Sequence, residues 1–442
     1  MSEERPADRL ARRVASREAT VAVIGLGYAG LPVAFTFAEG GFQVLGLDID
    51  EAKIHALRTG RCYIAHLGSE RLAGALGRGR FEPSHDFGRL AQADAIVVAV
   101  PTPLTPQRDP DLAHVVATAR TIAAHLRPGQ LVVLESTSYP GTTDEVVRPI
   151  LEATGLKAGA DFFLAFSPER EDPGNRQYTT ATIPKVVGGV DPVSTQLAAA
   201  LYGAVVERVV PVSDARTAEA TKLYENVFRA VNIALVNELK LVLDRMGIDV
   251  WEVLDAAATK PFGLMRFDPG PGWGGHCIPV DPFYLAWKAR EYGVTARFIE
   301  HAGEVNARMP EHVVDKLVRA LGDRGVPMRG ARILLLGVAY KRDVDDARES
   351  PAFEIMKLLL DRGAVVDYHD PHVPRMPVPR RLPSLPALSS TPLRADVIAA
   401  RDALIVVTDH TSVDYELVAR HARLVVDTRG VLRGRRPNVV QA

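Results

Sequence analysis

The sequence contains very little cysteine. Cys62 and Cys277 are the two cysteines in 442 residues, which is too few for a framework of disulfides. No group of cysteines and histidines has the ligand spacing of a zinc site, so we expect no bound metal. Both thiols suit a reducing compartment.

Long hydrophobic runs and an excess of basic charge are also missing. No apolar run approaches the roughly 18 residues of a spanning helix, and residues 1–19 lack the apolar centre of a secretory signal. A net charge of -1 gives no overall basic surface for nucleic acid. We therefore expect a cytoplasmic protein that binds neither membrane nor nucleic acid, although local lysines and arginines can still meet acidic ligands.

Residues that form a hydrophobic core are plentiful. Hydrophobic residues make up 47% of the chain and charged residues 24%, which is typical of globular proteins. A chain of 442 residues exceeds what one core usually supports, so we expect two or three domains.

Short apolar runs predict two α/β regions. The first begins with "TVAVIGLGYAGLPVAFTFAEGGFQVLGLDID", which reads as strand, glycine turn, helix and strand, and further apolar runs begin at residues 95, 131, 162 and 185. Runs this short and this apolar predict a parallel sheet buried on both faces. A second set of strands begins near residue 332, with a helix from Pro351 to Arg362.

A long helix is predicted between these regions. Residues 213–246 contain no glycine or proline, Ser213 or Asp214 is a candidate N-cap, and Gly247 ends the run. About 32 helical residues span ~48 Å, so we expect a connecting spine that packs against its copy in a homodimer. The predicted fold is α/β, with two Rossmann-like doubly wound domains joined by a central all-helical domain. The expected segments are a charged N-terminal tail (1–19), a first Rossmann-like domain (20–211), a helical dimerisation domain (212–312), a linker (313–330) and a C-terminal Rossmann-like domain (331–442).

Three glycines follow the first predicted strand. Gly25, Gly27 and Gly30 form G-x-G-x-x-G at the start of a helix, and Asp48 ends the next strand. A tight turn alone would explain the glycines, but this context predicts a dinucleotide whose pyrophosphate meets the helix N-terminus. Asp48 would accept hydrogen bonds from a ribose diol and repel a 2′-phosphate, which favours NAD over NADP. The segment "LLLGVAYK" near Gly337 lacks the second and third glycines, so the second α/β domain is expected to bind something else.

Polar residues on the long helix form a second candidate for a functional group of side chains. Lys222 and Asn226 are four residues apart and share one helix face, with Glu219 one turn earlier. Their N–H donors would stabilise a developing oxyanion. An exposed charge pair on an amphipathic helix explains the same spacing.

Two further candidates follow predicted strands. Glu169, in "FSPERED", and Thr137, in "ESTSYPGTT", lie where open α/β sheets gather ligands. Glu169 would be a general base for water, or one of four charges in a solvated turn.

The segment "GPGWGGHCIPVDP", residues 270–282, is too rich in glycine and proline for a helix or a central strand. Its Cys277 lies beside His276 and four residues before Asp281. A cysteine is nucleophilic as the thiolate, whereas a lone buried cysteine is commonly inert; the spacing leaves both interpretations open.

These parts together fit the oxidation of an alcohol to an acid. A first hydride loss gives an aldehyde, to which a thiolate adds. The resulting thiohemiacetal keeps a transferable hydrogen on carbon, and a second hydride loss gives a thioester that water cleaves.

The motifs resemble those of the NAD-dependent nucleotide-sugar 6-dehydrogenases, which include UDP-glucose, GDP-mannose and UDP-N-acetylhexosamine enzymes. The resemblance runs from about Val21 to Arg429 and rests on "GLGYAGLP", "VPTP", "ESTSYPGTT", "SPERED", "EATKLYENVFRAVNIALVNELK", "GPGWGGHCIPVDP" and "AYKRDVDDARES", in the family's order. It implies an oligomeric enzyme that uses NAD and binds a nucleoside-diphosphate sugar in its C-terminal domain.

The resemblance also implies roles for individual residues. Cys277 would be the nucleophile, and Lys222 and Asn226 would stabilise the oxyanion. Asp281 would help to order the catalytic water and the lysine; Glu169 would assist thioester hydrolysis, with Thr137 near the water. The implied cofactor contacts are Gly25, Leu26, Gly27, Tyr28, Ala29, Gly30, Asp48, Lys53, Val100, Pro101, Thr102, Pro103, Ser136, Thr137 and Arg348. The implied substrate contacts are Glu169, Arg170, Lys222, Asn226, Gly270, Gly272, Trp273, Gly274, Tyr340, Lys341 and Arg429.

The segment "GGHCIPVDPFYL" is most similar to the branch that acts on UDP-N-acetylglucosamine. The UDP-glucose branch usually has Ser and Lys where this chain has His276 and Val280, and often Arg where it has Pro261. Trp273 stands where a smaller apolar residue is expected. UDP-glucose and dTDP-glucose remain alternatives, as do a two-electron hydroxyacid-type dehydrogenase and a catalytically silent nucleotide-binding protein.

Overall fold

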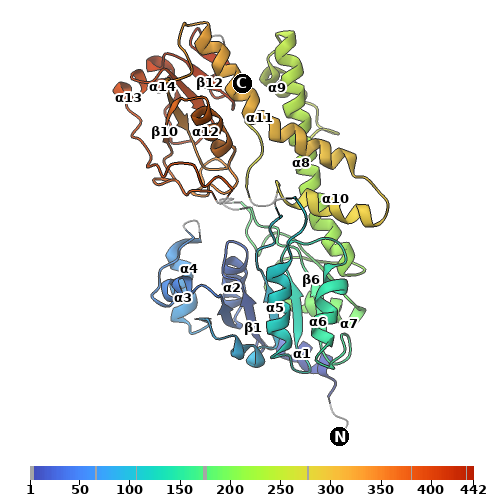
Figure 1. Ribbon diagram of the computed structural model, residues 1–442. Coiled ribbons are helices and arrows are strands. Elements are labelled where there is room, and N and C mark those ends of the chain that lie inside the picture. Colours follow the sequence, from blue (N-terminus) through green and yellow to red (C-terminus); the bar gives the residue numbers. More distant parts are fainter. Residues whose placement is uncertain are drawn as a thin grey trace. The chain divides into compact units, whose positions relative to one another are not determined.

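The computed structural model describes residues 4–64, 67–105, 107–172, 177–275, 278–379, 381–434 and 436–442. The chain divides into two compact units (Figure 1). Unit 1 consists of Met1–Glu225 and Phe283–Thr295, and unit 2 of Asn226–Pro282 and Ala296–Ala442.

Unit 1 is built on an eight-stranded sheet with strand order β3-β2-β1-β4-β5-β6-β7-β8. From β3 to β6 all neighbouring strands are parallel, as predicted. The strands are β1 (Thr20–Ile24), β2 (Gln43–Leu47), β3 (Phe81–Ser84), β4 (Ala95–Val98), β5 (Leu131–Leu134), β6 (Phe163–Phe166), β7 (Lys185–Gly189) and β8 (Val209–Pro211).

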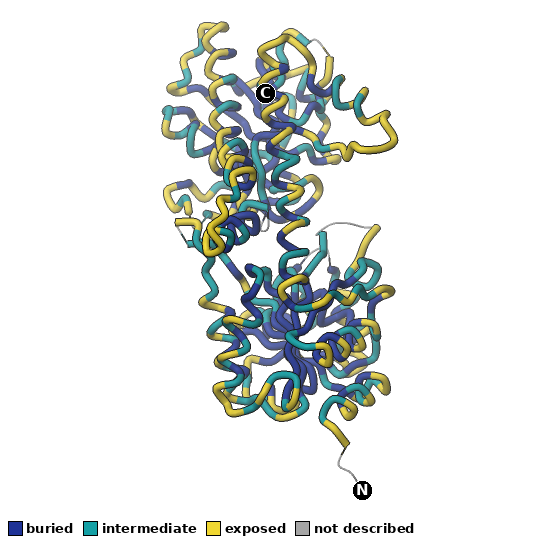
Figure 2. The backbone as a smooth tube through the Cα atoms, turned by 90° about the vertical axis from the view of Figure 1, so that its right-hand side faces the viewer, coloured by how far each residue is buried: buried dark blue, intermediate teal, exposed yellow. Residues whose placement is uncertain are grey.

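Helices cover both faces of this sheet, because its strands are apolar on both sides. One hydrophobic core joins the sheet to α1 (Pro6–Ala15), α2 (Gly30–Glu39), α3 (Glu51–Arg58), α4 (Gly68–Gly77) and α7 (Pro192–Gly203). The other joins it to α5 (Ala113–Ala123), α6 (Arg148–Glu152) and the 3₁₀ turn η2 (Phe87–Gln92). A π-helical turn, η3 (Thr142–Val147), precedes α6. Figure 2 shows the buried strands at the centre of this unit.

Two details of unit 1 differ from the expectation. The strand β7 runs antiparallel to β6, because the described residues between them contain no crossover helix and an antiparallel pair needs none. Residues 1–19, expected as a charged tail, include α1, whose Leu10 and Val14 are buried against the core.

The predicted long helix is present as α8 (Ala215–Met246). Asp214 caps it, accepting a hydrogen bond of 2.7 Å from the Thr217 N–H. The helices α9 (Val250–Ala257), α10 (Asp281–Glu291) and α11 (Arg297–Gly322) follow. Within the described ranges, none of the helices is both long and apolar enough to cross a bilayer.

Unit 2 contains a five-stranded parallel sheet of order β10-β9-β11-β12-β13. Its strands are β9 (Arg332–Leu336), β10 (Val365–His369), β11 (Ala403–Val406), β12 (Val425–Asp427) and β13 (Val439–Gln441), and its helices are α12 (Pro351–Asp361), α13 (Ala395–Ala399) and α14 (Tyr415–His421). The strand β13 was not expected, since three residues carry too weak a pattern. The chain is thus α/β, with two Rossmann-like sheets and a helical region that includes α8.

Candidate functional site

The glycine loop after β1 has the backbone that its motif predicts. Gly25 has φ +92°, and a Cβ there would lie 2.3 Å from the Ala99 carbonyl oxygen. A Cβ at Gly30 would lie 1.9 Å from the Gly25 carbonyl oxygen, whereas one at Gly27 would meet nothing within 4 Å. The first and third glycines therefore allow close packing, and the second leaves the loop open toward a ligand.

Asp48 supports this loop from the end of β2. Its Oδ2 accepts a hydrogen bond of 2.9 Å from the Leu26 N–H, and its Oδ1 accepts one of 2.9 Å from the Asp50 N–H. The Lys53 ammonium lies 3.2 Å from Oδ2. A carboxylate accepts about four hydrogen bonds, so Asp48 keeps capacity for a ribose hydroxyl.

The loops after β4 and β5 are joined to each other. The Ser136 Oγ accepts a hydrogen bond of 2.9 Å from the Val100 N–H, and the Tyr284 hydroxyl donates to the Pro103 carbonyl over 3.1 Å. Since parallel strands end at one edge of the sheet, the loops that carry residues 25–30, 48–53, 100–103 and 136–137 share that edge.

Glu219 is a fully buried residue of α8 that anchors the loop after Thr137. Its carboxylate accepts hydrogen bonds from the Gly141 N–H (2.6 Å), the Thr143 N–H (2.9 Å) and the Thr143 hydroxyl (2.6 Å). Burial raises the pKa of Glu219 to about 7, against these hydrogen bonds, which lower it. Its spacing from Lys222 was visible in the sequence, but its partners were not.

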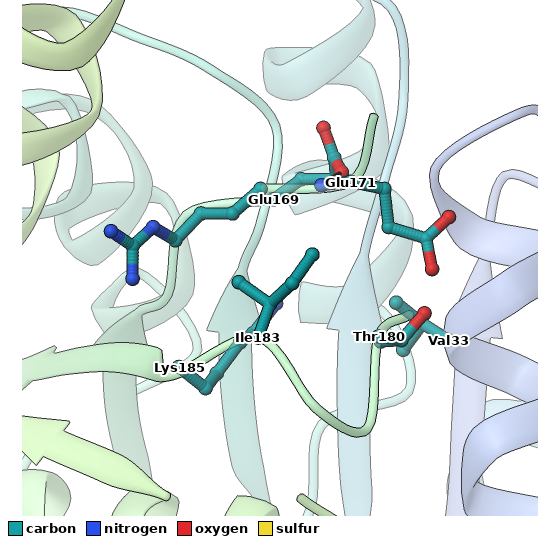
Figure 3. A pocket seen from close by; sticks show the side chains of 7 residues that line it. Val33, Glu169, Glu171, Thr180, Ile183 and Lys185 are labelled. Atoms are coloured by element: carbon teal, nitrogen blue, oxygen red, sulfur yellow. Dashed lines mark hydrogen bonds between the residues drawn. The ribbon is translucent and has the colours of Figure 1, made fainter. Parts of the chain in front are cut away.

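Glu169 and Lys222 lie together in unit 1. The Lys222 ammonium donates to the Glu169 carbonyl oxygen and is 3.7 Å from Glu169 Oε2. Lys222 is 5% exposed, which contradicts the alternative of an exposed charge pair at this position. Arg170 instead pairs with Glu225 at 2.6 Å. Figure 3 shows Glu169 beside Glu171, above Ile183 and Lys185.

A buried ion pair involves the residue directly before Ser136, and no sequence pattern predicted it. Glu135 and Lys185 are 2.9 Å apart, with side chains 0% and 6% exposed. The Tyr202 hydroxyl also donates to Glu135. Such a pair is costly to break on one side, so it fixes the β5 end of the loop.

Asn226 and Asp281 lie together in unit 2. Both are buried, and the Asn226 amide donates to Asp281 Oδ2 over 2.5 Å. The Arg229 guanidinium donates to Asn226 Oδ1 over 3.0 Å. These bonds fix the orientation of the amide, one turn along α8 from Lys222.

The glycine-rich segment that begins at Gly270 passes close to two of the proposed substrate contacts. A Cβ at Gly270 would lie 2.6 Å from the Arg429 guanidinium, and one at Gly274 or Gly275 would lie 3.0 Å from Tyr340. Gly272 has φ +123°, which a residue with a side chain rarely adopts. Trp273 follows it and is partly buried.

Arg429 and Arg348 have different partners. Arg429 donates to the Val407 carbonyl over 2.8 Å, and burial lowers its pKa. Arg348 pairs with the buried Asp346 at 2.6 Å, and its carbonyl accepts a hydrogen bond from the Gly275 N–H. Lys341 follows Tyr340 in the same loop after β9.

Cys277 and His276 lie outside the described residues. The structure therefore describes the segment on either side of the proposed nucleophile, through Gly275 and from Ile278 onward, and the role of Cys277 stays a prediction.

A cluster that no motif predicted lies in the loops of unit 2. Asp343, His372 and His410 each offer a possible ligand atom within 4.8 Å of the others. Both ring nitrogens of His410 already have partners, the Asp343 N–H at 3.0 Å and Asp370 at 3.1 Å. The cluster thus joins the loops after β9, β10 and β11 to one another.

Comparison with known proteins identifies the family. Three models of the UDP-glucose/GDP-mannose dehydrogenase family match the chain. The NAD binding domain matches residues 19–206, the central domain residues 216–308 and the UDP binding domain residues 334–434.

The chain is similar to several curated and solved relatives over most of its length. It is 34% identical to a UDP-N-acetyl-D-mannosamine dehydrogenase of Pyrococcus horikoshii, covering 93% of this chain and 96% of the relative. It is 37% identical to a UDP-N-acetyl-D-glucosamine 6-dehydrogenase of Pseudomonas aeruginosa, covering 81% and 84%. A solved UDP-D-ManNAc dehydrogenase from Pyrococcus horikoshii superimposes with a TM-score of 0.87 at 33% identity, covering 95% and 98%. The chain therefore belongs to the UDP-glucose/GDP-mannose dehydrogenase family and is an NAD-dependent nucleotide-sugar 6-dehydrogenase.

Proposed function

We propose that this enzyme oxidises the C6 hydroxymethyl of UDP-N-acetylglucosamine to the carboxylate, in two hydride transfers, through a thiohemiacetal and a thioester on Cys277. The observation that carries the proposal is the pairing of Lys222 with Glu169 and of Asn226 with Asp281, because these are the residues that the family resemblance assigns to the acyl chemistry.

The residues present fit NAD in unit 1. The open side of Gly27 admits a pyrophosphate to the helix N-terminus, and the Asp48 carboxylate keeps capacity for a ribose hydroxyl. We assign the cofactor to residues 25–30, Asp48, Lys53, residues 100–103, Ser136, Thr137 and Arg348. Bound NAD supplies a hydride acceptor for each of the two oxidations.

Each proposed step has a residue that serves it. Loss of a hydride and a proton converts the alcohol to an aldehyde, and the Cys277 thiolate then adds to the carbonyl carbon. Lys222 and Asn226 donate N–H groups to the oxygen that becomes negative. A second loss of hydride and proton gives the thioester, and Glu169 takes a proton from the water that cleaves it, with Thr137 and Asp281 ordering that water.

The substrate assignment rests on two supports. The motif around Cys277 resembles the UDP-N-acetylglucosamine branch, and the Pseudomonas aeruginosa relative carries that activity in its name. The Pyrococcus horikoshii relative makes UDP-N-acetylmannosamine the second candidate. We assign the sugar nucleotide to Glu169, Arg170, the glycine-rich segment, Tyr340, Lys341 and Arg429.

We also propose a cytoplasmic homodimer that packs along α8, with the three-domain division predicted above. One stripe of this helix exposes large apolar side chains, which is unusual for a face in contact with water. Its members are Tyr224, Phe228, Leu235, Leu239, Val242 and Met246. Light scattering of the purified enzyme tests the mass, and Leu235→Lys should shift it toward the monomer.

Rapid acid quenching followed by intact-mass analysis tests the covalent route. The wild type, mixed with NAD and UDP-N-acetylglucosamine, should show an adduct on Cys277, and Cys277→Ser should show none and form almost no acid. Full acid formation by Cys277→Ser would contradict the thioester route. Comparing kcat/KM for UDP-N-acetylglucosamine, UDP-N-acetylmannosamine, UDP-glucose and dTDP-glucose then ranks the substrates.

A further inference from the structure

A second glutamate lies beside Glu169 and has no part in the mechanism above. The Glu171 N–H donates to Glu169 Oε1, so the two residues form one tight turn after β6. The Glu171 side chain extends toward Thr180 and Val33 (Figure 3). The turn therefore places a second carboxyl group next to the proposed base.

A small cavity is shared by the two glutamates. Glu169, Glu171 and Lys185 line it, with Arg170, Thr180, Ile183 and Val33 completing the wall. It leaves about 10 Å³ for the centre of a water molecule, which is room for roughly one water. One water in this space would have the two carboxyl groups among its neighbours.

The charges around Glu171 come from several elements. Glu169 is the nearby negative group; Arg71 of α4 and Lys185 of β7 are the positive ones, and the Thr180 N–H donates to the Glu171 carboxylate. Asp172 follows it in the chain, and Lys222 faces Glu169 from α8. Glu171 is thus partly buried, and among the residues that the structure describes it forms no ion pair at contact distance.

We propose that Glu171 is a proton relay for Glu169, through a water held in the cavity that they share. This inference rests on the proposed function, because it requires Glu169 to act on the water that cleaves the thioester. Glu171 acts through Glu169 and touches neither substrate nor cofactor, so it is a positioning and relay residue.

The proton balance explains why such a relay is needed. Water attacks the thioester carbon, an O–H bond breaks, a C–O bond forms and the C–S bond breaks. One proton of the water goes to Glu169 and must leave before the next turnover; the other is available to the departing thiolate. Glu169 passes its proton to the cavity water, which passes one to Glu171, and Glu171 releases it to solvent.

The acidity of Glu171 suits this task. Burial raises the pKa of Glu171 to about 7, and the negative charge of Glu169 adds to the rise, against Arg71 and Lys185. A group with a pKa near neutral pH both takes and releases a proton readily. Because the accepting form is the ionised one, thioester hydrolysis should speed up as pH rises through about 7.

The test compares the pH dependence of Glu171→Gln with that of the wild type. Gln keeps the shape and can still accept from the Thr180 N–H, but it cannot take a proton. In this variant we expect kcat at pH 8 to be about 10- to 100-fold lower than in the wild type. The increase of kcat with pH near neutrality should disappear. A pre-steady-state burst of two NADH per site should remain, because the hydride steps precede hydrolysis. Glu207→Gln, an exposed residue of the same unit, is the matched control and should retain the wild-type profile.

A second variant separates the relay from a purely structural role. Glu171→Ala enlarges the cavity, and added formate should restore part of its hydrolysis rate. An unchanged pH profile in Glu171→Gln, or no formate rescue in a folded Glu171→Ala, would overturn the relay. Failure of the proposed function itself gives a different result, since the wild type would then release fewer than two NADH per sugar.

Discussion

Asp48 in unit 1 and Asp370 in unit 2 both follow the second strand of a parallel sheet, and both accept hydrogen bonds from the loop after the first strand. Asp48 accepts from the Leu26 N–H and the Asp50 N–H and pairs with Lys53. Asp370 accepts from the N–H groups of Val338, Ala339, His372 and Val373 and contacts His410. The same residue at the same place thus has three partners in one sheet and five in the other, among the residues that the structure describes.

The difference explains how one fold serves two binding tasks. A carboxylate accepts about four hydrogen bonds, so Asp48 can still bind a ribose, whereas Asp370 has no remaining capacity. Both loops begin with a glycine. A Cβ at Gly25 or at Gly337 would clash with the loop that follows a neighbouring strand. Unit 2 lacks the later glycines. Its loop therefore lacks the dinucleotide fingerprint of unit 1, and the family model matched there is a UDP binding domain.

The largest expected effect comes from adding one methyl group to each loop. In Gly30→Ala the Cβ would lie 1.9 Å from a backbone oxygen, so the turn must shift, and we expect the Kd for NAD to rise at least about 100-fold, ~2.7 kcal/mol. In Gly337→Ala, where the contact is 2.5 Å to Thr408, we expect ~1–3 kcal/mol of destabilisation with an unchanged Kd for NAD. Calorimetric titration measures the Kd for NAD of each variant, and thermal unfolding measures its stability. Equal NAD binding by the two variants would contradict the comparison.

Removing the charge of Asp370 should cost stability and not cofactor affinity. Burial raises the pKa of Asp370, but the hydrogen bond and charge of His410 and the Ala339 and Val338 N–H groups outweigh this and hold it well below its usual range. An amide offers one acceptor oxygen where the carboxylate offers two, so Asp370→Asn should lose about 2 kcal/mol of unfolding free energy. Urea unfolding at pH 7 measures the loss. This stabilisation should disappear in acid, as pH falls below the usual carboxyl pKa toward the depressed one.

The equivalent change in unit 1 should weaken the binding of the cofactor. Asp48→Asn keeps the loop's hydrogen-bond acceptor but removes the charge, so we expect the Kd for NAD to rise about tenfold, ~1.4 kcal/mol. The preference for NAD over NADP should narrow, because no carboxylate repels the 2′-phosphate. Titration with both coenzymes tests this, and unchanged discrimination would mean that another group sets it.

The smallest effect concerns Glu219, the buried carboxylate that anchors a loop in unit 1. Its pKa is raised to about 7, whereas the pKa of Asp370 is lowered. The two carboxyl groups should therefore change the unfolding free energy in opposite directions as pH rises. A raised pKa stabilises the folded state at low pH, and this stabilisation is lost as pH rises from the usual value through about 7. Unfolding free energy should fall by about 1 kcal/mol between pH 6 and 7, and Glu219→Gln should remove that slope. Denaturant unfolding of the wild type and of Glu219→Gln at both pH values measures this change in unfolding free energy.

The elements predicted from the sequence are those whose signal is local. The first βαβ unit and α8 have strong patterns over neighbouring residues, with Asp214 as a cap at the expected position. The antiparallel direction of β7 depends on how a connection returns to the sheet, and the packing of α1 depends on α7, far along the chain. Neither is visible in a local pattern.

The same limit applies to the site. Lys222 and Asn226 could be picked out because helix geometry fixes their spacing. The partners of Glu219 are 76 and 78 residues away in sequence, and the ion pair of Glu135 with Lys185 joins the residue after β5 to the first residue of β7. Such contacts join residues that are distant in sequence and meet only in the folded sheet, so they could be identified only from the structure.

Counting NADH against a limiting amount of sugar nucleotide tests the central claim most directly. With UDP-N-acetylglucosamine as the limiting reactant and NAD in excess, the account predicts two NADH and one carboxylate for each sugar consumed. One NADH per sugar, with the aldehyde as the product, would contradict it.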